Sequence, residues 1–187
     1  MSTADPRTAV VETAREMLRL ALVAGSAGNV SVRAGDAVLI TPAGLAYEEM
    51  TEEDVVTLGP GGDAEEGVRE PSSERRVHLA IYAERPDVGA IVHTHSVHAT
   101  AWSFLGEPLD TGTEELGAAA GGPVLTSEFA ATGGEEIAAA AVTALGSRGA
   151  VLLGRHGVVG VGATPGQALT RCVVVERQAE MAWLLRR

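Results

Sequence analysis

Hydrophobic residues along this chain repeat with two different periods, and the segments that carry them alternate. Apolar residues recur every three or four positions between Val10 and Leu22, which predicts an amphipathic helix that begins after Asp5 and Pro6. Short apolar or alternating runs predict strands at residues 29–33, 36–42, 55–58, 89–95, 123–128, 150–155 and 156–162. Further helices are predicted at residues 72–83, 96–106, 134–147 and 164–185.

This alternation of strands and helices indicates an α/β layered fold. With 187 residues, 45% of them hydrophobic, the chain can bury a core large enough to be stable alone. No internal repeat, low-complexity linker or change in composition divides the sequence, so we expect one domain spanning residues 1–187.

Net charge and composition limit the kinds of binding partner and the cellular compartment that we expect for this protein. The net charge of −11 argues against nucleic acid or an anionic membrane as the main partner, because both favour a basic face. No run approaches the roughly 18 apolar residues of a membrane span, and the charged residues near the start lead us to expect no signal peptide. The single cysteine, Cys172, excludes an intrachain disulfide and is typical of a reducing compartment, so we expect a cytoplasmic protein.

The sequence contains no lysine, and all fourteen of its basic residues are arginines. Schiff-base aldolases, pyridoxal-phosphate enzymes and Walker-type nucleotide sites each need a particular lysine amine. These three kinds of site are therefore excluded.

Three of the five histidines, His93, His95 and His98, lie within six positions. Residues two apart in a strand face the same side, so the first two can share a metal ion, whereas His98 lies beyond the strand. A zinc ion takes three or four ligands, and His156, between two predicted strands, is the expected third. The glycine after it would let backbone or substrate approach closely. Glu74, the nearest upstream acid, could be a fourth ligand or a general base.

On its own, a His-x-His pair is more often structural than metal-binding, so the residue pattern leaves both interpretations open. His98 could support such a site by hydrogen-bonding to a metal ligand without binding the metal itself. His78, in a predicted helix with no matching partner, is interpreted as structural or exposed.

Several separated motifs of this chain resemble the class II aldolase/adducin family, which includes L-fuculose-phosphate aldolases and L-ribulose-5-phosphate 4-epimerases. The motifs are GNVS (28–31), ITPAG (40–44), EPSSE (70–74), IVHTHSVHAT (91–100) and RHG (155–157). The likeness covers nearly the whole chain. It implies a single three-layer α/β/α domain with a central mixed, largely antiparallel sheet.

The resemblance also implies the parts of an active site. His93, His95 and His156 would bind a divalent metal, usually zinc, and Glu74 would be both a ligand and the catalytic acid–base group. Backbone amides and hydroxyls of three loops would bind the substrate phosphate, at Gly28, Asn29, Thr41, Gly44, Ser72 and Ser73. The family further implies a homotetramer with active sites between subunits.

The resemblance implies aldol chemistry, and the lack of lysine excludes the Schiff-base form of it. When a carbon–carbon bond breaks beside a carbonyl, the electron pair left behind needs an electrophile, which here would be a metal ion. We therefore expect a zinc-dependent aldolase that cleaves or forms such a bond in a short sugar or hydroxy-keto substrate, expected to be phosphorylated, through a metal-stabilised enediolate. The alternatives are an L-ribulose-5-phosphate 4-epimerase-like enzyme, a ketose-phosphate dehydratase and, least favoured, a non-catalytic adducin-like assembly domain.

Two positions depart from the family pattern. The third position of the TPAG loop usually carries a hydroxyl but is Ala43 here, so one phosphate contact is missing. Aldolase-like members supply a tyrosine proton donor from a neighbouring subunit, and the corresponding stretch 111–117 has none. Glu114 and Glu115 are the nearest candidates for a proton donor in trans.

Overall fold

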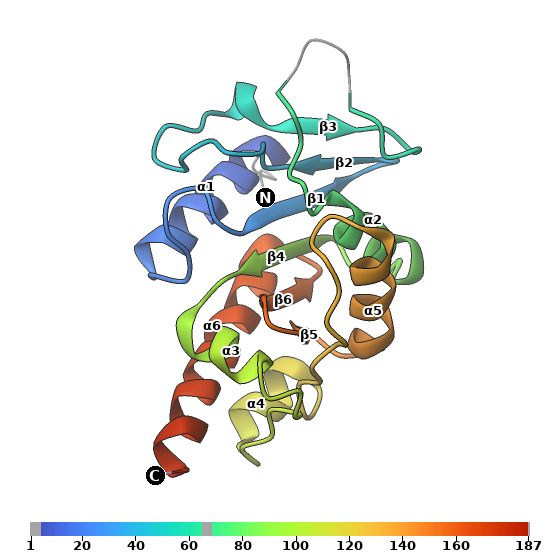
Figure 1. The fold of residues 1–187 in the computed structure, drawn as a ribbon. Coiled ribbons are helices and arrows are strands. Elements are labelled where there is room, and N and C mark those ends of the chain that lie inside the picture. Colours follow the sequence, from blue (N-terminus) through green and yellow to red (C-terminus); the bar gives the residue numbers. More distant parts are fainter. Residues whose placement is uncertain (1–4, 65–68, 187) are drawn as a thin grey trace.

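A computed structural model describes residues 5–64 and 69–186, in which helices lie on both faces of one sheet (Figure 1). The strands of this sheet follow the order β3-β2-β1-β4-β6-β5. They are β1 (Asn29–Ala34), β2 (Ala37–Ile40), β3 (Val56–Leu58), β4 (Ala90–Thr94), β5 (Ala150–Leu153) and β6 (Gly157–Gly162). The helices are α1 (Pro6–Arg19), α2 (Arg75–Glu84), α3 (Val97–Ser103), α4 (Glu114–Ala120), α5 (Glu135–Leu145) and α6 (Pro165–Leu185), with a short 3-10 turn η1 (Glu52–Asp54).

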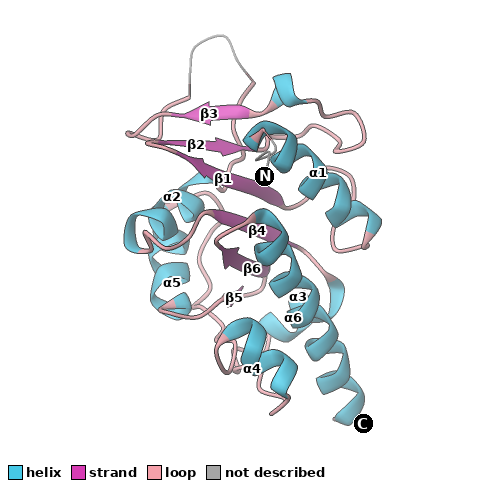
Figure 2. Cartoon of the chain, turned by 180° about the vertical axis from the view of Figure 1, so that it is seen from behind, coloured by secondary structure: helices cyan, strands magenta, loops and turns pink. Residues whose placement is uncertain are grey.

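The sheet separates two hydrophobic cores. Helices α1, α3 and α6 cover one face, and α2 and α5 cover the other (Figures 1 and 2). Neighbouring residues of β4 show how the strands divide the cores, because Val92 packs into the first and Ile91 into the second. This is the three-layer α/β/α arrangement expected from the sequence. Within the described residues, the five strand pairings are antiparallel, and an isolated bridge between Thr126 and Leu152 is parallel.

Three elements differ from the sequence-based prediction. The prediction of a strand at residues 123–128 is wrong. This segment makes isolated bridges, from Val124 to Leu109 and from Thr126 to the short edge strand β5, and does not form a continuous strand. Helix α2 begins three residues later than predicted, since Ser72 first forms a turn in which its hydroxyl accepts from the Glu74 N–H over 3.3 Å. Helix α4 was not predicted, because its seven residues are mostly alanine, glycine and glutamate and show no clear period.

Gly160 in β6 allows α6 to pack directly on the sheet. A Cβ at this position would lie 2.4 Å from the Ala168 carbonyl oxygen and 2.8 Å from Cys172 Sγ. Replacing Gly160 with valine should therefore lower the free energy of unfolding by about 3 kcal/mol, the upper end of ordinary overpacking costs. Urea unfolding measures the change.

Gly166→Ala is the matched control, because a Cβ at Gly166 in the first turn of the same helix meets open space. It should leave the stability unchanged or raise it slightly. A Gly160→Val protein as stable as the wild type would contradict the tight packing of α6.

Candidate active site

The pairing of β4 with β6 brings the three histidines together. His93 lies in β4 and His95 just beyond it, while His156 immediately precedes β6. In the antiparallel register Thr94 lies opposite Val158, so the end of β4 is beside the start of β6. The ring centroid of His156 is consequently 4.9 Å from that of His93 and 4.8 Å from that of His95.

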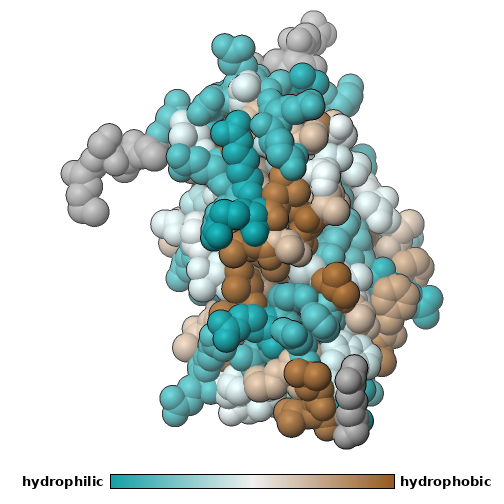
Figure 3. Space-filling model, turned by 90° about the vertical axis from the view of Figure 1, so that its left-hand side faces the viewer, coloured by the Kyte–Doolittle hydropathy of each residue, from teal (hydrophilic) through white to brown (hydrophobic). Residues whose placement is uncertain are grey.

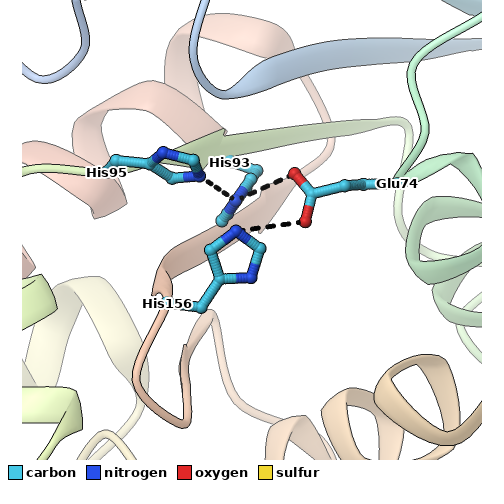
Figure 4. Close-up of side chains that lie close together, drawn as sticks. All are labelled: Glu74, His93, His95 and His156. Carbon is cyan, nitrogen blue, oxygen red and sulfur yellow. Dashed lines mark hydrogen bonds and ion pairs between the residues drawn. The ribbon is translucent and has the colours of Figure 1, made fainter. Parts of the chain in front are cut away.

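Glu74 completes a cluster with these rings from the turn before α2. Its Oε2 lies 3.1 Å from His93 Nε2, and its Oε1 lies 3.3 Å from His156 Nε2 (Figure 4). One candidate ligand atom from each of Glu74, His93, His95 and His156 lies within 4.8 Å of all the others. We call these four residues the histidine–glutamate cluster.

A glycine after His156 is required by the closeness of the two strands. A Cβ on Gly157 would lie 2.3 Å from the Thr94 carbonyl oxygen and 3.2 Å from ring atoms of both His93 and His95. The close backbone approach expected from the sequence is confirmed, and it is the backbone of β4 that approaches.

The hydrogen bonds of His93 make it suitable as a metal ligand. Its Nδ1 lies 2.9 Å from the Val158 carbonyl oxygen, which can only accept, so Nδ1 carries the proton. When the ring is neutral, the lone pair of Nε2 then faces the cluster, as in many metal-binding histidines. Since His95 Nε2 lies only 2.9 Å away, two lone pairs facing each other would repel unless a proton or cation lay between them.

The spacing and chemistry of the cluster fit a divalent metal ion. Tetrahedral zinc ligands at about 2.0–2.1 Å from the metal lie roughly 3.3 Å from one another. The nearest separations in the cluster, 2.9, 3.1 and 3.3 Å, are of this size. Glu74 Oε1 is also buried, with no hydrogen-bond partner among the described residues, and a bound cation would satisfy it.

The protonation states also suit metal binding. Burial opposes ionisation of Glu74, but His93, His156 and Asn29 together hold the pKa of this carboxyl well below its usual range. Burial and the neighbouring His93 lower the pKa of His95 to about 4 and lower that of His156 as well. Burial alone would lower the pKa of His93, but the Glu74 carboxylate raises it. A metal ion would displace the His93 proton, because ligands bind in their deprotonated form.

Beside the cluster lies a cavity of about 200 Å³. Its lining includes five of the six residues expected to bind substrate, namely Gly28, Asn29, Gly44, Ser72 and Ser73, and three of the cluster, Glu74, His95 and His156. The sixth, Thr41, does not line the cavity. It is fully buried, and its hydroxyl accepts a hydrogen bond from the Val30 N–H over 3.2 Å.

Four other residues singled out in the sequence lie outside the cluster. His98 does not support it, because its Nδ1 pairs with Glu176 Oε1 at 2.8 Å. His78 is fully buried and bonds to Asn29 through Nε2. Glu114 and Glu115 are exposed on α4 and do not line the cavity.

Comparison with known proteins identifies the family. The sequence model described as "Class II Aldolase and Adducin N-terminal domain" matches residues 8–183. The chain belongs to this family. Class II aldolases are metal-dependent lyases. The relatives described next are named as aldolases, which favours the aldolase interpretation over the 4-epimerase alternative.

A 5-methylthioribulose-1-phosphate/5-deoxyribulose-1-phosphate aldolase of Rhodospirillum rubrum is 40% identical over 177 residues, covering 95% of this chain and 80% of that protein. An L-fuculose phosphate aldolase of Escherichia coli O6:H1 is 41% identical over 172 residues, covering 92% of this chain and 80% of its own length. A solved structure of an L-fuculose 1-phosphate aldolase superposes with a TM-score of 0.93 at 33% identity, covering 100% of this chain and 88% of that one. These likenesses confirm the expected fold class and the expected lyase activity.

Proposed function

We propose that this protein is a zinc-dependent aldolase that cleaves a short ketose 1-phosphate into a three-carbon ketone phosphate and an aldehyde. One observation carries the proposal: the histidine–glutamate cluster forms part of the wall of a cavity whose other lining residues have short side chains and come from four segments, residues 26–29, 42–44, 72–73 and Thr132. The names of the aldolase relatives support phosphorylated ketoses as substrates.

The reaction can be followed in the condensation direction. Glu74 takes a proton from the carbon next to the ketone, and that carbon attacks the aldehyde, whose oxygen receives a proton from an acid. Cleavage runs the same steps in reverse. Glu74, His93, His95 and His156 would hold a divalent cation, which would supply a Lewis acid to stabilise the electron pair left beside the carbonyl. The lowered pKa of Glu74 keeps its carboxyl ionised, which is the form that can accept a proton.

The loops of the cavity are suited to an anion. Helix α2 begins directly after Glu74, which lines the cavity, so the positive partial charge of the helix N-terminus lies beside the cavity. Gly28 and Gly44 both adopt positive φ angles, of 73° and 71°, which keep their loops tight and their backbone accessible. Ala43 also lines the cavity, so no hydroxyl is offered there and the anion would rely on the serines and backbone amides.

Product analysis tests the proposal. L-fuculose 1-phosphate and 5-deoxyribulose 1-phosphate should each release the same three-carbon ketone phosphate, together with a free aldehyde. An epimerase would instead return an isomer of the starting sugar without free aldehyde, and a non-catalytic assembly domain would leave both sugars unchanged. Metal analysis of the purified protein should find zinc at about one ion per chain.

A homotetramer in the cytoplasm belongs to this proposal. Large hydrophobic side chains are exposed on and beside α3 and at the end of α6, namely Val97, Phe104, Leu184 and Leu185. Figure 3 shows hydrophobic patches on the side of the molecule that carries these helices. Contacts between subunits would bury such surface. Sedimentation velocity tests the assembly. Among the described residues, no helix combines the length and the hydrophobicity that a membrane span requires.

Glu115 is the stronger candidate for the acid supplied by a neighbouring subunit, because Gln178 Nε2 donates to its Oε2 over 2.8 Å and so orients it. Glu115→Gln should reduce turnover by about 10²- to 10⁴-fold, the usual contribution of a positioned acid, while zinc content is retained. Glu114→Gln, one residue away on the same helix, is the matched control and should leave turnover nearly unchanged. If Glu115→Gln keeps the wild-type rate, this residue has no part in the mechanism.

A further inference from the structure

A continuous chain of buried hydrogen bonds runs from Glu74 into the protein interior. Asn29 Nδ2 donates to Glu74 Oε2 over 2.8 Å, and His78 Nε2 lies 2.5 Å from Asn29 Oδ1. On the other side of the imidazole ring, His78 Nδ1 lies 2.6 Å from Ser31 Oγ, which lies 2.9 Å from the Tyr82 hydroxyl. None of the five residues is more than 5% exposed.

The ionised carboxylate fixes the direction of every bond in this chain. Glu74 can only accept, so Asn29 turns its amide nitrogen to it and presents Oδ1 to His78. Oδ1 also can only accept, so His78 must carry its proton on Nε2 and accept at Nδ1 from the Ser31 hydroxyl. Ser31 in turn accepts from Tyr82. One neutral tautomer of His78 therefore satisfies all five groups.

The side-chain amide of Asn29 is largely committed by these bonds. Its oxygen is taken by His78 and one amide proton by Glu74, which leaves a single Nδ2 proton for a substrate. His78 itself comes from α2, one helical turn after Glu74, while Asn29 comes from β1. These hydrogen bonds thus tie the turn that carries Glu74 to the sheet that carries His93.

We propose that His78, acting through Asn29, is a positioning residue that holds the Glu74 carboxylate in the orientation in which its two oxygens face His93 and His156. The inference rests on the proposed metal site but not on any substrate. Hydrogen-bond partners behind a ligand set its orientation, and their loss typically weakens metal binding about 10- to 100-fold.

The test is the affinity for Zn²⁺, measured by competition with a chromophoric chelator in the absence of sugar. His78→Leu removes the donor and should weaken binding by about 10- to 100-fold. His78→Gln, which carries an amide N–H near the position of Nε2, should recover most of the loss. Gln178→Leu is the matched control: Gln178 is also buried, at 2% exposed, and hydrogen-bonded, but to residues outside the cluster. It should keep wild-type affinity.

A double mutant separates positioning from a general loss of stability. If His78 acts through Asn29, then His78→Leu should have no further effect on Zn²⁺ affinity once Asn29→Ala is present. Wild-type affinity in a folded His78→Leu protein, equal losses in the leucine and glutamine variants, or additive losses in the double mutant would each overturn the proposal.

The tautomer gives a readout in the unmodified protein, which also applies should His78→Leu fail to fold. Long-range ¹H–¹⁵N spectra of the zinc-bound protein should show His78 neutral and protonated on Nε2. A proton on Nδ1 would reverse the bonds and contradict the proposal. Neither measurement uses a substrate, so a failure to cleave ketose phosphates would refute the proposed function and leave this inference standing.

Discussion

Replacing His93 with alanine should reduce aldol cleavage about a thousandfold or more and remove most of the bound metal. His93 Nε2 lies 3.1 Å from Glu74 Oε2 and 2.9 Å from His95 Nε2, so its loss leaves a gap at the centre of the ligand set. Lewis-acid stabilisation is worth several kcal/mol, and each 1.36 kcal/mol changes a rate tenfold. Metal content by mass spectrometry and release of the three-carbon ketone phosphate measure the two effects.

His98→Ala is the matched control for this experiment. His98 comes five residues later in the same segment, but it bonds Glu176 instead of the cluster, with its Nδ1 2.8 Å from Glu176 Oε1. Its alanine variant should keep its metal and most of its activity, with a modest loss of stability. A His93→Ala protein with a full complement of metal and normal turnover would refute the proposed site.

Replacing Glu74 with glutamine should lower turnover by about 10²- to 10⁴-fold even when zinc is saturating. The substitution keeps the shape of the side chain and removes the charge that His93, His156 and Asn29 stabilise. Because the three histidines of the proposed metal site remain, the metal should still bind at high zinc concentration, although more weakly. The defect in turnover is then a defect in proton transfer.

Deuterium exchange isolates that proton transfer. In D₂O the wild-type enzyme should exchange the proton at the carbon next to the ketone of the three-carbon product, without any aldehyde present, and Glu74→Gln should not. Glu176→Gln is the matched control, because Glu176 is a mostly buried carboxylate that accepts from the backbone N–H groups of His98 and Ala99 and does not belong to the cluster. If the Glu74 variant exchanges at the wild-type rate, another group is the base.

The sequence by itself determined the local parts of this protein. Six of the seven strands predicted from apolar runs are present in the structure, because the alternation of hydrophobic and polar residues along a strand can be read residue by residue. The same period of two predicted that His93 and His95 share a side, and their Nε2 atoms are 2.9 Å apart. The resemblance of separated motifs then supplied the family, which the comparison confirms over residues 8–183.

Only the tertiary structure decided which distant residues meet. The separation of His156 from His93 depends on the β4–β6 register, and the bond of Asn29 to Glu74 spans 45 residues, so neither can be read from local periodicity. His78 looked unpartnered in sequence because both its partners come from β1, on the face of the sheet that α2 covers. Thr41 proved to bond to Val30. The physical reason is that strand and helix periods fix which way a side chain points, whereas strand pairing and layer packing fix what it finds there.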